Sequence, residues 1–287
     1  MKKLLSLGLA LGVLGLILGC TPQNAPPATT PIVTTTAATT EPTTVATTEP
    51  TTVPTTLPEH SDLYLPYLSV EDVIRYFNEV CLDAEFVNAG DPTRLQKWVV
   101  PIRYYIYGTY TEEDKATLDS LVSWLNQVDG FPGMHMVEDP MIAGLNIHFC
   151  GPEEYLTLMG DQFYGTDGGV TFWYNGANQI YDAVIGYRTD LDQQVRNSVI
   201  LEEIYNGLGP INDTWERMNS VIYGGYSIPQ WLSEEDQLIM KLLYHPMMEC
   251  GMDAAQCEAV IRQLYYYFNG PSGRPVPTYN ERRRFYA

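Results

Sequence analysis

The sequence predicts an α/β domain in which helices pack on one twisted, mixed sheet and the C-terminal part is helical. Three observations lead to this fold class. Short segments rich in Val, Ile and Tyr alternate with amphipathic segments between residues 69 and 208. Two further segments with helix-start patterns follow a turn-rich stretch near the C-terminus. The length of residues 59–287 suits a single domain, so these elements are expected to share one core.

The first half of the domain is expected to begin with a helix and to continue into strands. Residues 69–81 have an amphipathic pattern, with Ser69 as the N-cap and Asp72 closing a capping box. Residues 97–108 are rich in Val, Ile and Tyr, which favours a strand. The elements expected next, in chain order, are a helix over 112–128 and strands over 134–137 and 144–150.

A β-hairpin and a long helix are expected to follow. Residues 170–174 and 180–188 flank an Asn-Gly dipeptide, which is typical of a hairpin turn. Asp190 is then expected to cap a helix that runs to Leu208, with Gln193 closing the capping box. The helices of the C-terminal part are expected to begin after the N-caps Ser233 and Asp253.

The first twenty residues are predicted to be a bacterial lipoprotein signal peptide. Lys2 and Lys3 precede an apolar run over 4–18, which is shorter than the ~20 residues that a membrane span needs. The run ends in Ile-Leu-Gly-Cys, which resembles a lipoprotein cleavage box, and this resemblance implies that Cys20 becomes lipid-modified. The protein is then expected outside the cytoplasm, anchored in the plasma or outer membrane. The alternative is an ordinary signal peptide, or a membrane anchor with an incidental cysteine.

A Thr- and Pro-rich stretch of low complexity occupies residues 21–58. It has no aromatic residue and few charges, so it cannot form a core. Its prolines favour extended polyproline II backbone. We therefore expect a disordered stalk between the lipid anchor and the domain.

The charge of the chain argues against some partners. The formal net charge is −19, so the phosphates of a nucleic acid and anionic lipid headgroups would both be repelled. Contact with the bilayer is therefore expected through lipidated Cys20. The remaining partners are open, and an envelope protein, a peptide or a glycan would each be compatible with the composition.

Four cysteines remain after the signal peptide, and an extracytoplasmic location permits disulfides. Cys250 and Cys257 are the preferred pair, because Cys250 lies just before the helix that Asp253 is expected to cap and could fold back onto its first turn. Cys81 and Cys150 would form the second pair. The alternative is that all four are free, buried thiols.

The most informative pattern lies in the helix predicted to end near residue 208. Its sequence LEEIYNGLGPIN aligns with the His-Glu-x-x-His-x-x-Gly-x-x-His pattern of secreted zinc proteases. In this alignment Glu203 stands at the catalytic Glu, while Glu202, Asn206 and Asn212 stand at the three histidines. The chain thus resembles a degenerate metzincin-like (zincin-like) domain that lacks the zinc-binding histidines.

The sequence downstream supports the same resemblance. Ser-Val-Ile-Tyr at residues 220–223 stands where metzincins have a Met-containing turn, with Ile222 at the Met position. Residues 232–244 resemble the helix that closes the metzincin domain. The order of the predicted elements also matches, because the active-site helix of metzincins follows the last strands. The resemblance therefore implies a metzincin-like fold.

The replaced histidines change the chemistry that the site could perform. Glu202 and Asn206 are four residues apart and so share a helix face. Asn is a neutral oxygen donor and a poor zinc ligand, whereas calcium and magnesium prefer oxygen donors. No cofactor is expected, and the alternative is a weak divalent metal site at Glu202, Asn206 and Asn212. Without a metal, these side chains would line a solvated cleft or hold the following loop by hydrogen bonds.

A second resemblance covers more of the chain. A bacterial family of domains of unknown function, largely predicted lipoproteins, shows Glu-Glu-x-x-Gln-x-Leu-Gly followed by Asn-Asp. This chain matches with Glu202-Glu203, Leu208-Gly209 and Asn212-Asp213, while Asn206 departs from the Gln of that family. The resemblance spans most of residues 70–265 and implies a metzincin-like fold without an established activity.

These observations favour a binding or structural module of the cell envelope over an enzyme. The four histidines have no ligand spacing, and no Gly-x-Ser-x-Gly nucleophile motif is present. The alternative is a metal-dependent, peptidase-like hydrolase with Glu203 as general base. A purely architectural envelope protein without a ligand is the third hypothesis.

Overall fold

The computed structural model describes residues 63–82 and 94–265, all of which belong to one compact unit of the chain. The predicted signal peptide, the lipidation site Cys20 and the Thr/Pro-rich stalk lie outside the described residues. No helix among the described residues is long and apolar enough to cross a membrane.

A single six-stranded mixed sheet forms the centre of the domain, as the sequence predicts. The strands are β1 (Lys97–Trp98), β2 (Ile102–Gly108), β3 (Met134–Met136), β4 (Leu145–Cys150), β5 (Gly168–Tyr174) and β6 (Gln179–Arg188). Strands β3, β2, β4 and β6 lie side by side in that order and are all parallel. Strand β5 pairs with β6 in the antiparallel sense. Strand β1 is parallel to β6.

The register places β5 at the edge of the sheet. Ala183 of β6 pairs with Leu145 of β4 and with Phe172 of β5, so β4 and β5 lie on opposite sides of β6. Ile180 pairs with Trp98 of β1 as well as with β5, so β1 lies on the same side of β6 as β4. The antiparallel hairpin of β5 and β6 therefore provides the last strand of the sheet.

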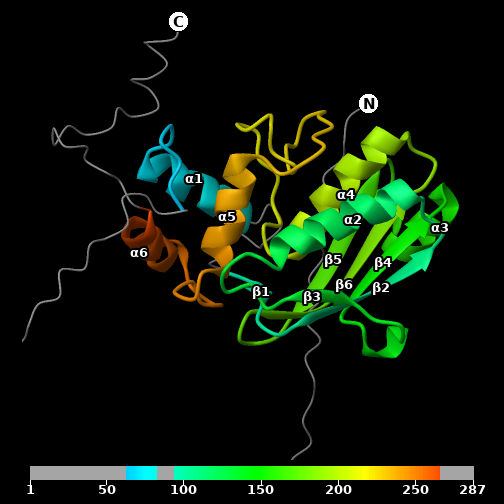
Figure 1. Ribbon diagram of the computed structural model, residues 1–287, viewed down its shortest axis with the longest axis horizontal. Coiled ribbons are helices and arrows are strands. Elements are labelled where there is room, and N and C mark those ends of the chain that lie inside the picture. Colours follow the sequence, from blue (N-terminus) through cyan, green and yellow to red (C-terminus); the bar gives the residue numbers. More distant parts are fainter. Residues whose placement is uncertain (1–62, 83–93, 266–287) are drawn as a thin grey trace, which may run out of the picture. The chain divides into compact units, whose positions relative to one another are not determined.

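Six α-helices accompany the sheet among the described residues. They are α1 (Val70–Cys81), α2 (Glu112–Leu125), α3 (Pro152–Met159), α4 (Gln193–Gly207), α5 (Glu234–Tyr244) and α6 (Ala254–Leu264), with short 3-10 turns η1 (Pro140–Ile142) and η2 (Asp161–Phe163). Helices α2 and α4 pack on each other and lie across the strands in Figure 1. Helices α1, α5 and α6 form the helical part, in which α1 packs against both α5 and α6.

Two adjacent glycines show that helices cover both faces of the sheet near β5. A side chain at Gly168 would meet Val199 of α4, whereas one at Gly169 would meet Phe163 of η2 and Tyr155 of α3. Successive residues of a strand point to opposite faces. Helix α4 therefore covers one face of the sheet, and α3 with η2 covers the other.

The local helix signals are confirmed at three of the four positions where an N-cap is expected. Full capping boxes are present at Ser69, Ser233 and Asp253. Asp190 was expected to cap the helix that ends near residue 208, and this prediction is wrong. The helix begins at Gln193 after Asp192, because the carboxylate of Asp190 pairs instead with Arg188 at 2.7 Å.

Two further differences concern the strands and α3. The single strand expected over 97–108 is two strands, β1 and β2, separated by Pro101, which has no N–H to donate to a neighbouring strand. Helix α3 was not predicted. It contributes Tyr155 and Met159 to a small second core with Cys150 and Phe163, apart from the main core of the domain.

Candidate functional site

Helix α4 carries the candidate site residues and is held firmly between other elements. It follows β6 directly and packs on β5, β6 and α2. Its C-terminal carbonyls are satisfied by side chains, because Trp98 Nε1 donates to Gly207 O at 3.0 Å and Tyr244 OH donates to Leu208 O at 2.8 Å. These bonds fix the end of the helix where Asn206 lies.

The carboxylate at the catalytic position of the alignment lies inside the domain. Glu203 is only 3% exposed, whereas Glu202 on the neighbouring face is half-buried. Strand β5 approaches α4 closely here because Gly168 has no side chain. A Cβ at that position would lie 3.1 Å from Glu203 Cγ. The first residue of β5 therefore packs directly on Glu203.

Two buried tyrosines lie near the same carboxylate. Burial raises the pKa of Tyr155 well above its usual range, and the charge of Glu203 raises it further. The pKa of Tyr187 is likewise raised, first by burial and then by the charges of Glu203, Asp114 and Glu202. The hydroxyls of both tyrosines have partners, with Tyr155 OH 2.6 Å from Thr166 Oγ1 and Tyr187 OH donating to Ile200 O at 3.3 Å. Glu203 thus lies in a polar, buried environment beneath the edge strand.

Asn206 is the most unusual polar side chain of α4. It is 1% exposed, and neither its Oδ1 nor its Nδ2 has a hydrogen-bond partner within residues 63–82 and 94–265. A buried amide without partners costs roughly 1–3 kcal/mol. The side chain at the second histidine position therefore retains hydrogen-bonding capacity inside the domain.

The structure directs Asn212 towards α1. Its Nδ2 donates to Glu79 O at 3.2 Å, and its backbone N–H donates to Val80 O at 3.2 Å. Glu202, Glu203 and Asn206 share one helix, while Asn212 anchors the loop that follows α4. No group of three or more His, Cys, Asp or Glu side chains is placed to hold a metal ion in the part of the chain that the structure describes.

The turn at residues 220–223 is organised by Asp236 of α5. The Asp236 carboxylate is fully buried and accepts hydrogen bonds from Val221 N at 3.1 Å, Ser220 Oγ at 2.7 Å and Tyr76 OH at 2.8 Å. It also closes the capping box of α5 with Ser233. Sequence reasoning identified the cap but missed the connection to α1 and the turn, because nothing in the local pattern marks Asp236 as buried.

A second buried carboxylate joins α2 to α4. Asp114 is fully buried, forms an ion pair with Arg196 and accepts a hydrogen bond from Gln193 Nε2 at 2.7 Å. It also closes the capping box of α2 with Thr111. No local sequence pattern indicates this ion pair, because Asp114 and Arg196 belong to elements far apart in the chain.

The four cysteines among the described residues are unbonded, and neither pair expected from the sequence is joined. Cys81 and Cys257 belong to the main core, whereas Cys150 belongs to the second core. Cys250 is half-buried, with its Sγ 3.7 Å from Lys97 O.

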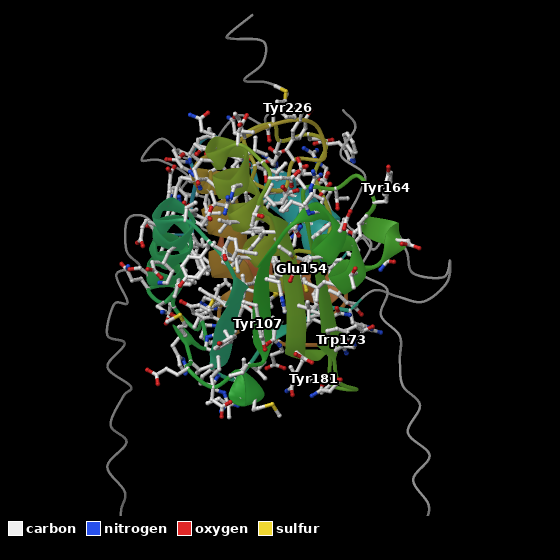
Figure 2. All side chains as sticks on the ribbon, turned by 90° about the vertical axis from the view of Figure 1, so that its right-hand side faces the viewer. Tyr107, Glu154, Tyr164, Trp173, Tyr181 and Tyr226 are labelled. Atoms are coloured by element: carbon white, nitrogen blue, oxygen red, sulfur yellow. The ribbon has the colours of Figure 1, made fainter. Side chains whose placement is uncertain are left out.

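The loop between α4 and α5, residues 211–233, exposes several large apolar side chains, and we call it the aromatic loop. Trp215 is 58% and Tyr226 72% exposed, and Met218 and Trp231 are also exposed. In Figure 2, Tyr226 lies near the top of the view, well apart from the labelled residues Tyr107, Trp173 and Tyr181. This loop is not among the sites predicted from the sequence, although its composition could have indicated it.

The fold and the site together define a mixed α/β domain whose central helix carries buried carboxylate and amide side chains. The family model described as "protein of unknown function (DUF2927)" matches residues 70–263. The chain therefore belongs to this family, which confirms that it is a member of a domain-of-unknown-function family. No curated protein matches the sequence.

Proposed function

We propose that this protein is an extracytoplasmic lipoprotein whose metzincin-like domain acts as a non-catalytic binding or structural module of the cell envelope. The observation that carries the proposal is the burial of Glu203 and Asn206, which are 3% and 1% exposed. A general base must reach the substrate or a water molecule next to it. A carboxylate covered by β5 is better suited to stabilising the domain than to catalysis.

The metzincin-like part of the proposal is supported by the order and packing of the elements. Helix α4 follows the last strand, β6, and carries the residues aligned with the zinc-protease pattern. The turn over 220–223 follows α4 and is tied to α5 through Asp236. Ile222, at the position of the turn methionine, is fully buried in the main core.

The aromatic loop is the proposed binding surface. Exposed Trp and Tyr side chains offer large apolar contact area together with a polar group, and they are enriched in interfaces. The loop is anchored at both ends, because Asn212 binds α1 and the residues after it lead into the capping box at Ser233. A rigidly anchored loop that exposes Trp215 and Tyr226 fits an envelope protein, a peptide or a glycan as partner.

The binding proposal is tested with the full chain and with components of the cell envelope. Isothermal titration calorimetry measures binding independently of the loop tryptophans, so we would titrate the protein with isolated peptidoglycan fragments, soluble surface glycans and peptides. We expect saturable binding that is weakened at least about tenfold by the double substitution Trp215→Ala and Tyr226→Ala. The matched control replaces Tyr174 and Tyr181, exposed on the β5–β6 hairpin, and should leave binding unchanged. Equal binding by both variants would exclude the aromatic loop as the surface.

A second candidate function is favoured by the amide of Asn206. A buried amide without protein partners could accept a cation or a metal-bound water, and oxygen donors suit calcium or magnesium. Glu202, Asn206 and Asn212 would then be the ligands and Glu203 the general base of a hydrolase. The fit is poor, because the Nδ2 of Asn212 is already bonded to Glu79 O and the set holds one carboxylate.

Metal content separates the two candidates. The protein purified without added metal should contain no stoichiometric divalent cation if it is a binding module. Near-stoichiometric metal that disappears in Glu202→Gln would instead support the hydrolase, and peptide hydrolysis lost in Glu203→Gln would establish it. The aromatic-loop variant serves as the control, because it retains all the proposed ligands and should not change the metal content.

A further inference from the structure

Two of the four described cysteines lie at the contact between the first and the last helix of the domain. Cys81 is the last residue of α1, and Cys257 lies in the first turn of α6. The two helices pack against each other, and both cysteines are buried in the main core. Glu71 at the start of α1 pairs with Arg262 near the end of α6, and Glu79 and Glu258 line one groove, so the end of α1 lies near the start of α6. A disulfide there requires Cα atoms within about 7 Å.

Both thiols have raised pKa values, mainly because they are buried. Burial is the main cause of the raised pKa of Cys81, and the charge of Cys257 is the second cause. The other two cysteines are placed differently. Cys150 is part of the second core, and the thiol of Cys250 contacts Lys97 O. Cys81 and Cys257 are the two described cysteines that belong to the main core, and they are neither of the pairs expected from the sequence.

We propose that Cys81 and Cys257 form a disulfide that joins α1 to α6. The oxidant is a disulfide compound, either an oxidised dithiol protein in the envelope or oxidised glutathione in vitro. One cysteine thiolate attacks a sulfur of that disulfide and releases the first thiol. The second cysteine thiolate then attacks the mixed disulfide, so that the S–S bond forms and the second thiol is released. Two protons and two electrons pass from the cysteines to the oxidant.

The bond would strengthen a contact that is otherwise held weakly at the surface. The two helices are joined by the ion pair of Arg262 with Glu71 at 3.0 Å, and both side chains are largely exposed. Exposed ion pairs contribute little to stability. A bond between residues 81 and 257 closes a loop that contains the whole sheet and α4, and long loops gain the most from closure.

The timing of the reaction follows from the burial of both thiols. Burial raises the pKa of Cys257 to about 12, although the nearby cation of Lys97 lowers it in part. A buried thiol with a raised pKa is a poor nucleophile once the domain has folded. The bond therefore forms before α6 is fully packed. If the protein folds reduced, both thiols should resist alkylation until it is denatured.

Disulfide mapping tests the inference. The full chain is isolated from the membrane fraction in detergent without reductant, denatured with an alkylating agent, digested and analysed by mass spectrometry. A second sample is reduced, unfolded and refolded in a mixture of reduced and oxidised glutathione. We expect a cross-linked peptide pair containing Cys81 and Cys257 in the refolded sample, with Cys150 and Cys250 alkylated. Free Cys81 and Cys257 after refolding, or a bond to another cysteine, would overturn the inference.

The sample from cells tests the proposed extracytoplasmic location, because the supply of an oxidant in the cell rests on that proposed location. A cross-link found in the refolded sample but missing from the cellular protein would contradict that location and leave the pairing intact.

The double variant Cys81→Ala and Cys257→Ala gives an independent measurement. Reductant should lower the Tm of the wild type and of the Cys150→Ala, Cys250→Ala control by about 5 °C or more. It should leave the Tm of the Cys81→Ala, Cys257→Ala variant unchanged, and equal shifts in all three proteins would contradict the bond.

Discussion

Buried polar side chains are the most informative individual residues of this domain. Glu203, Asn206, Asp114 and Asp236 are all buried, although their residue types are usually exposed. The sequence marks each as polar, and the alignment with the zinc-protease pattern singles out the first two. Their burial follows from the elements packed over them, such as the start of β5 on Glu203. The identity of the candidate site residues was therefore predictable, and their environment was not.

The close contact of β5 with α4 depends on Gly168. In Gly168→Ala the new methyl group would press on Val199 and on Glu203 Cγ, 3.1 Å away, so the helix or the strand must shift. We expect a loss of about 1–3 kcal/mol in the free energy of unfolding, measured by urea denaturation. The matched control is Gly176→Ala in the hairpin turn, where nothing lies within 4 Å of the added carbon. That control should change the stability by less than about 0.5 kcal/mol, and an equal loss in both variants would contradict the tight contact.

At the scale of the elements, local signals worked where the helix start depends on nearby residues. The N-caps Ser69, Ser233 and Asp253 are predictable because a capping side chain binds the backbone only three positions further on. The prediction at Asp190 was wrong because Arg188, two residues away, binds its carboxylate. Helix α3 was missed, since its eight residues expose most side chains and bury two.

The pair of helices α2 and α4 is predicted to depend on the buried ion pair of Asp114 with Arg196. Asp114→Ala would leave the guanidinium of Arg196 without its buried partner and would remove the capping box of α2. We expect a loss of about 3 kcal/mol or more in unfolding free energy. The comparison is Asp119→Ala, which breaks the more exposed pair with Lys115 on the same helix. That change should cost about 0.5 kcal/mol or less, and similar losses at both positions would rule out a special role for the buried pair.

At the scale of the whole molecule, one core holds the sheet and the helical part together. It draws residues from α1, the central strands, α4, α5 and α6, whereas α3 and η2 contribute to the second core. Large tyrosines fill much of this core, among them Tyr76, Tyr205 and Tyr244. Their hydroxyls are bonded to groups of other elements, as in the donation of Tyr205 OH to Asp236 O at 2.9 Å.

These buried tyrosines predict a loss of stability at alkaline pH. Burial raises the pKa of Tyr76, Tyr187 and Tyr205 well above the usual value of about 10. The folded protein therefore retains protons that the unfolded chain loses above pH about 10. The contribution of each tyrosine is complete below that pH and decreases as the pH rises.

The pH dependence is measured by urea denaturation at pH 8, 10 and 11. Between pH 10 and 11, Tyr187→Phe should lose about 1 kcal/mol less stability than the wild type, because one buried hydroxyl no longer titrates. The exposed residue Tyr226 gives the control, and the stability of Tyr226→Phe should change with pH in the same way as that of the wild type. An unchanged slope in Tyr187→Phe would show that this hydroxyl is not protected in the folded state.

The sequence by itself determined the fold class, most helix starts, the hairpin and the family, because capping, turn formation and hydrophobic periodicity are local properties. It also placed Glu202, Glu203 and Asn206 on one helix, since residues three and four apart share a face. Only the tertiary structure decided that Glu203 lies under β5, that Asn212 binds α1 and that Cys81 faces the helix of Cys257. These outcomes depend on contacts between segments far apart in the chain, whose free energy is set by the packing of the complete core.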